Sequence, residues 1–139
     1  MSENVVVKAE VGFHDKEKPG MGRMAKGQLI LTNRRLIYIK HRGGKFLGAK
    51  VEDYSSRIEE GLKNEGSFEV PLGQVSEAKA ERIWGTPYLK VNYQTISGEK
   101  AGSFILLSTW SMYGASFGKA PYEELAKIIE QLRNEASKS

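Results

Sequence analysis

Two short apolar runs separated by a two-residue turn constrain the fold of this chain more than any other feature. Residues 28–32 and 36–40 each have the length and aliphatic composition of a strand, and Asn33 and Arg34 lie between them. Asparagine tolerates a left-handed backbone, so this pair is suited to a tight turn. The sequence therefore predicts an antiparallel hairpin over 28–40.

Further strands are predicted on both sides of this hairpin. Valine-rich residues 3–11 precede it, and the patterns at 68–72, 75–82, 88–93 and 103–107 follow it. Ser97 and Gly98 indicate a second hairpin turn, and the stretches 14–26 and 108–119 have the composition of loops. The chain is therefore expected to contain about seven strands.

Two segments instead show the spacing of an amphipathic helix. Over 47–64, apolar side chains recur every three or four residues, which predicts a helix inserted between the third and fourth strands. A second helix is predicted over 121–135, where Pro121 suits the first turn. Its apolar stripe consists of Tyr122, Leu125, Ile129 and Leu132. This stripe can cover the open end of a curved sheet.

The order of these elements resembles the pleckstrin-homology-like (PH-like) superfold, and in particular the GRAM and prokaryotic PH-like domains. Residues 27–38 are close to the family's hairpin pattern G-x-L-x-L-T-x-x-R-L-I, and 68–75 resemble its I-P-L-x-x-I strand. The likeness covers about 3–135. It implies one domain over 1–139, mainly β with α: a partly open barrel of about seven antiparallel strands, capped by a C-terminal helix. The inserted helix is an addition to that scaffold.

Composition and motifs argue against an enzyme. The chain has 139 residues and no cysteine, which excludes disulfides and thiolate chemistry. The phosphate-binding, dinucleotide, zinc-protease and nucleophile-elbow motifs are absent, and His14 and His41 lack metal-ligand spacing. No catalytic residue, metal or cofactor is therefore expected. No apolar run approaches the roughly 20 residues of a membrane span, and no secretory signal is visible, which indicates a cytoplasmic location.

The first candidate site is a basic cluster after the central hairpin. It consists of Lys40, His41, Arg42 and Lys45, with two glycines at the turn. Such a loop can hold phosphates, aided by exposed backbone N–H groups. The resemblance points the same way, because many PH domains grip anionic lipid headgroups with basic residues near strand ends. The alternative is a solvated loop without a ligand.

The second candidate is an apolar interaction surface. Its members are Trp110, Met112, Tyr113 and Phe117 in the predicted loop, with Tyr54 and Ile58 on the inserted helix. Tryptophan and tyrosine are common anchors at interfaces. The alternative is that these side chains pack on the domain's own core. Trp84 is expected in the core or at a sheet edge.

A non-enzymatic binding or scaffold module is the preferred function, through protein–protein interaction or self-association as a homo-oligomer. Peripheral binding of anionic lipid headgroups is the alternative, which would place the protein at a membrane surface. Nucleic-acid binding is the weaker alternative, because a net charge of +4 and a pI near 9.2 are mild for that partner.

Overall fold

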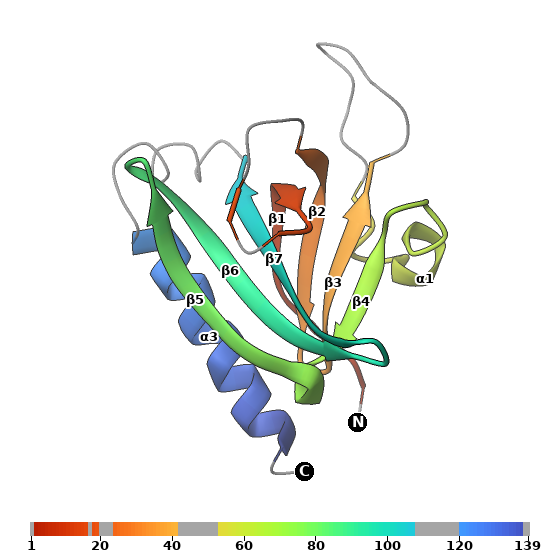
Figure 1. Cartoon of the computed structure of the whole chain (residues 1–139). Helices are drawn as coiled ribbons and strands as arrows, with labels where there is room; N and C mark the ends of the chain where they lie inside the picture. Colours follow the sequence, from red (N-terminus) through yellow and green to blue (C-terminus); the bar gives the residue numbers. More distant parts are fainter. Residues whose placement is uncertain (1, 17, 20–23, 42–52, 108–119, 138–139) are drawn as a thin grey trace.

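The computed structural model describes residues 2–16, 18–19, 24–41, 53–107 and 120–137. Seven antiparallel strands form one strongly curved sheet, and a long C-terminal helix packs against it (Figure 1). The strands are β1 (Val5–His14), β2 (Ala25–Thr32), β3 (Arg35–Lys40), β4 (Phe68–Pro71), β5 (Val75–Ile83), β6 (Thr86–Thr95) and β7 (Gly98–Leu106). The helices are α1 (Ile58–Gly61), the 3₁₀ turn η1 (Leu72–Gln74) and α3 (Ala120–Ser137).

The strand order is β4-β3-β2-β1-β7-β6-β5, so β4 and β5 are the two edges of the sheet. Because these edges do not pair with each other, the barrel is open, as the resemblance to the PH-like superfold implied. Each strand pairs with antiparallel neighbours, and the central β1 joins the two halves by pairing with both β2 and β7. The predicted fold class, mainly β with an additional helix between β3 and β4 and a closing helix, is confirmed.

The β2–β3 hairpin is confirmed, but its turn works differently from the prediction. Asn33 does not have a positive φ, since Trp84 is the only non-glycine residue in that region among those described. The turn is instead held by Thr32, whose Oγ1 accepts the backbone N–H groups of Arg34 (3.1 Å) and Arg35 (3.0 Å). The Asn33 side chain accepts the Asn4 N–H at 2.7 Å, so it ties down the first residues of the chain.

Strands β2 and β3 are buried on both faces, which explains their unbroken apolar runs. Their inner face contributes Leu29, Leu31, Leu36 and Tyr38 to the main core. Their outer face presents Ile30, Ile37 and Ile39 to a second, smaller cluster. Tyr54, Ile58 and Leu62 of the β3–β4 connection cover that cluster. The connection therefore acts as a lid on the outer side of the sheet.

The predicted helix over 47–64 is wrong in extent. Within the described part of the connection, only Ile58–Gly61 is helical; residues 47–52 lie outside the described residues. The preceding turn is fixed by side chains that compete with a helix. Gln28 accepts the Tyr54 N–H at 2.8 Å and donates to the Asp53 carboxylate at 3.1 Å. The described apolar residues of the segment do pack on the sheet, but these polar contacts hold a turn ahead of Ile58, and the described part is helical only over Ile58–Gly61.

The C-terminal helix covers one end of the barrel, as predicted, and its bounds lie within two residues of the expected 121–135. Tyr122, Leu125 and Ile129 are buried in the main core. Glu130 accepts the Ala78 N–H at 2.8 Å, and Arg133 donates to the Ser76 carbonyl. These contacts occupy part of the free edge of β5, which limits edge-to-edge pairing. Among the described residues, no helix is long and apolar enough to cross a membrane.

Candidate functional site

A cleft of about 1250 Å³ opens at the barrel mouth that α3 does not cover. Its lining residues come mainly from the edge strand β4, the end of β1 and the β6–β7 hairpin. It is lined by Phe13, His14, Asp15, Lys16, Ala25, Lys40, Gly66, Phe68, Glu69, Val70, Gln74, Tyr93, Gln94, Thr95, Ile96, Ser97, Lys100 and Ala101. It is larger than a shallow groove of about 570 Å³ between β5 and α3.

The inner wall of the cleft is aromatic. Phe13 lies at its centre, with ring centroids 4.9 Å from Tyr38, 5.2 Å from Phe68 and 5.1 Å from Phe104. Phe68 stacks on Tyr93 at 5.9 Å. Tyr38 and Phe104 are fully buried, whereas Phe13, Phe68 and Tyr93 are only partly buried and face the opening. Five strands, β1, β3, β4, β6 and β7, thus deliver inward side chains to one apolar surface.

Both tyrosines of this cluster stay neutral at physiological pH. Burial raises the pKa of Tyr38 far above its usual value, and its hydroxyl donates to the Ala25 carbonyl at 2.6 Å. Burial, followed by the negative charge of Asp15, raises the pKa of Tyr93. The Tyr93 hydroxyl therefore gives the cleft a polar O–H group beside its aromatic wall.

The rim of the cleft is basic. Lys16, Lys40 and Lys100 line it and are exposed. Of its two lining carboxylates, Glu69 is within 3.0 Å of the Arg35 guanidinium, so its charge is balanced. Asp15 is therefore outweighed by three lysines. The opening combines an apolar wall with an excess of positive charge.

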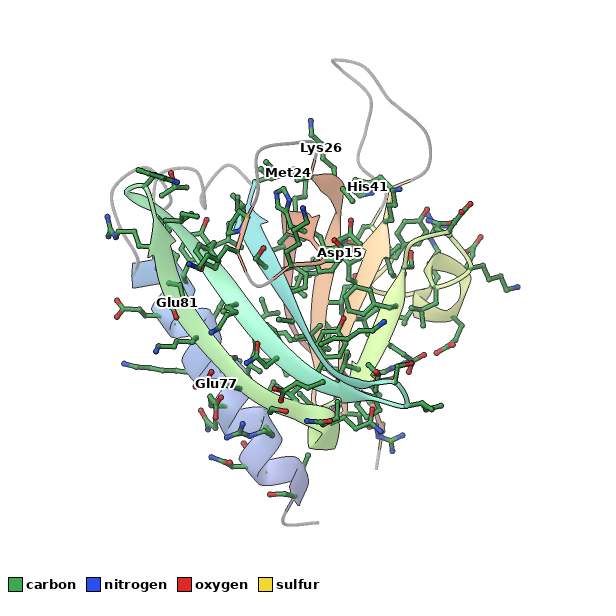
Figure 2. The ribbon with its side chains drawn as sticks, in the orientation of Figure 1. Asp15, Met24, Lys26, His41, Glu77 and Glu81 are labelled. Atoms are coloured by element: carbon green, nitrogen blue, oxygen red, sulfur yellow. The ribbon has the colours of Figure 1, made fainter. Side chains whose placement is uncertain are left out.

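Of the predicted basic cluster, the structure describes Lys40 and His41. Lys40 lies on the cleft rim, where its N–H donates to the Ser67 hydroxyl at 2.8 Å and its carbonyl accepts the Asn64 amide at 2.9 Å. His41 follows directly and is half-buried (Figure 2). Arg42 and Lys45 lie outside the described residues. Lys40 thus lies on one rim with Lys16 and Lys100.

The predicted apolar surface has two outcomes. Trp110, Met112, Tyr113 and Phe117 lie outside the described residues. The assignment of Tyr54 and Ile58 to an interaction surface is wrong, because both cover the domain's own sheet. Tyr54 is only 3% exposed, and its ring also receives the Arg57 guanidinium at 4.7 Å. Packing on the isoleucines of β2 and β3 accounts for both side chains.

Trp84 is also corrected, in the opposite direction. The sequence placed it in the core or at a sheet edge, but it is 96% exposed. It forms the β5–β6 turn with Gly85, and both residues have a positive φ, +50° and +80°. Two-residue hairpin turns of this kind favour Asn-Gly, because both central residues need a positive φ. The glycine after Trp84, between two strand patterns, was the signal that could have indicated this position.

Comparison with known proteins identifies the fold. No family model matches the chain, and no curated protein matches it. Among solved structures, the chain is similar to the Vps36 N-terminal PH domain, with a TM-score of 0.57 and 12% sequence identity. The match covers 99% of this chain and 83% of that one. At this identity the likeness shows the fold alone, so the chain has a PH-like fold, and the finer likeness to GRAM domains stays a prediction.

Among the described residues, no group of three or more histidine, aspartate or glutamate side chains is arranged to hold a metal ion. The cleft combines a concave apolar wall with a few polar groups, which is typical of ligand-binding pockets.

Proposed function

We propose that this domain is a non-enzymatic protein-binding module. Its cleft receives a partner segment that carries a bulky apolar side chain next to acidic residues. One observation carries this proposal: an aromatic wall, formed by Phe13, Phe68 and Tyr93, lies beneath a rim of lysines at the open mouth of the barrel.

The aromatic wall favours a partner with a large apolar anchor residue. Three half-buried rings around one opening are covered well by another large side chain, and interface hot spots are typically such anchors in desolvated pockets. Aromatic pairs also favour the offset and tilted geometries that already relate Phe13, Phe68 and Tyr93. A tryptophan, phenylalanine or tyrosine of the partner fits this wall.

The lysines of the rim favour a partner that carries acidic residues beside that apolar anchor. Lys16, Lys40 and Lys100 are flexible, exposed cations, and each can reach a carboxylate at the mouth of the cleft. Exposed ion pairs contribute little affinity individually, so we expect these lysines to set preference and association rate more than strength. Neutral or basic segments are disfavoured for the same reason.

The two edges of the sheet are poorly suited to pairing with an added strand, so we expect recognition to occur through side chains. Strand β4 is four residues long and ends in Pro71, which has no N–H to donate. The edge of β5 is partly occupied by Glu130 and Arg133 of α3. Neither edge offers a long row of free backbone groups for an added strand. The cleft is therefore the better-formed contact surface.

Selection from a displayed library of random peptides tests the proposal. We expect enrichment of peptides with one aromatic residue and neighbouring aspartate or glutamate. The double variant K40E/K100E should lose these peptides, while K63E/K127E, with the same charge change at exposed lysines outside the cleft, should keep them. Enrichment of basic peptides, or equal loss in both variants, would contradict the proposal.

A second arm uses the same variants with vesicles of neutral and acidic phospholipids. We expect no saturable, cleft-dependent sedimentation with either vesicle. If acidic vesicles bind the wild type but not K40E/K100E, and no peptide is selected, the cleft serves anionic lipid headgroups and the protein-binding proposal fails. Salt sensitivity alone does not decide, because both partners meet the lysines through charge.

A further inference from the structure

We infer that the segment received by the cleft is extended and carries the pattern acid-x-aromatic-x-acid, in which x is any residue. This inference rests on the proposed function and specifies how the charges of the partner are arranged around its anchor. It follows from the positions of the lysines, which lie on two different sides of the aromatic wall.

The aromatic wall is one continuous surface. The ring of Phe68 contacts both of the others, with centroids 5.2 Å from Phe13 and 5.9 Å from Tyr93. Gly102 makes room for this surface, because a Cβ at that position would lie 2.6 Å from the Phe13 ring. An aromatic side chain of the partner can therefore lie across the wall, and charged groups meet it only at the margins.

Lys100 and Lys40 lie on different sides of this wall. Lys100 is on β7, where it is the cross-strand neighbour of Tyr93. Lys40 is on β3, beyond the residue that pairs with Phe68. Its stem lies against Gly66, where a Cβ would be only 2.8 Å from the lysine Cδ. The two cations therefore flank the wall, one from the β7 side and one from the β3 side.

A net positive charge remains on each side among the residues that line the cleft. On the β3 side it is the charge of Lys40, because the lining glutamate is paired with Arg35 at 3.0 Å. On the β7 side, Lys100 and Lys16 together outweigh Asp15, whose negative charge acts on the adjacent tyrosine. One acid on each side of the anchor therefore matches the cleft better than two acids on the same side.

An extended segment places its side chains in this arrangement. Alternate side chains of an extended chain point to the same face, so the residues two before and two after the anchor share its face. At about 3.3 Å per residue these two positions lie about 13 Å apart, which carries their carboxylates past the anchor toward the flexible lysines. Acids directly next to the anchor point away from the wall. In a helix, residues two apart do not face the same way.

Three acetylated, amidated peptides of identical composition test this spacing by isothermal titration calorimetry. Glu-Gly-Trp-Gly-Glu carries the inferred pattern, Gly-Glu-Trp-Glu-Gly moves both acids next to the anchor, and Glu-Gly-Glu-Gly-Trp puts both on one side. We expect wild type to bind the first about tenfold tighter than the second and about threefold tighter than the third, since these lose two and one exposed ion pairs.

Charge reversal then assigns the two ends. The peptides Lys-Gly-Trp-Gly-Glu and Glu-Gly-Trp-Gly-Lys differ only in which end is acidic. K40E should prefer one of them at least threefold, and K100E should prefer the other, because each variant accepts the lysine at the side where it now carries a carboxylate. K63E makes the same charge change at an exposed lysine outside the cleft and should behave like wild type.

Equal affinity of wild type for the three isomers would overturn the inference, as would the same preference in K40E and K100E. The proposed function fails separately. If the isomers bind equally and all are lost in K40E/K100E, the cleft still binds an acidic, aromatic segment and only the flanking pattern is excluded. If wild type shows no saturable binding to any of the three, both are refuted.

Discussion

Replacing Trp84 with asparagine is predicted to stabilise the isolated domain, although tryptophan is the larger and more apolar residue. Trp84 is 96% exposed, so its removal gives up almost no packing. Its backbone, at φ +50°, lies in a region that costs most L-residues about 1–2 kcal/mol and that asparagine visits readily. The net expectation is a gain of about 1 kcal/mol in the free energy of unfolding.

Urea denaturation followed by circular dichroism measures this change, at concentrations where the protein is monomeric. A gain of about 1 kcal/mol corresponds to a rise of about 4 °C in Tm for a chain of this size. Trp84→Ala is the matched control: it removes the ring but keeps a residue that is strained at positive φ, so its stability should stay within about 0.5 kcal/mol of wild type. Destabilisation by either substitution would refute the reasoning, because it would mean that the ring packs on the domain itself.

Three further substitutions test the scaffold. Tyr122→Phe removes the hydroxyl that accepts the buried Leu106 N–H at 3.1 Å, so we expect a loss of about 1–3 kcal/mol in urea; no loss would mean that water replaces it. Glu3→Gln tests the pH dependence: hydrogen bonding by Arg35 lowers the pKa of Glu3, so its contribution is present above the unfolded pKa, near 4.3, and is lost as pH falls through the lower folded value. The variant should therefore be less stable than wild type at pH 7 and approach it below pH 4, and a constant difference would refute this. Glu130→Ala should speed hydrogen exchange of the Ala78 amide, and unchanged exchange would show that the helix does not protect this edge.

Periodicity predicted most of the fold because burial imposes it directly. The β2–β3 hairpin and α3 were found from apolar spacing, and both bury that spacing in the main core. The segment 47–64 shows the limit of this reasoning. Its described apolar residues, Tyr54, Ile58 and Leu62, do face the sheet, but Gln28, from a distant strand, binds the backbone of Tyr54 and holds a turn there. Spacing reports which side chains are buried, and it does not report which distant polar group shapes the backbone.

Most of the candidate site could not be predicted from the sequence, for a related reason. Phe13, Phe68 and Tyr93 are more than twenty residues apart from one another in the chain, and only the curvature of the sheet brings their rings together. Lys40 was singled out, but with its neighbours in sequence; its neighbours on the rim come from the end of β1 and from β7. Trp84 was misplaced because its large apolar side chain was given more weight than the glycine that follows it.

A titration followed by ¹H–¹⁵N NMR tests the central claim, binding by the cleft, most directly. The probe is an acetylated, amidated peptide of sequence Glu-Glu-Trp-Gly-Glu, added to the wild-type protein. The account predicts saturable shift changes at Phe13, Phe68, Tyr93 and Lys100, and their loss in K40E/K100E. Saturable changes in the groove between β5 and α3, around Ala126 and Glu130, or no saturation anywhere, would contradict it.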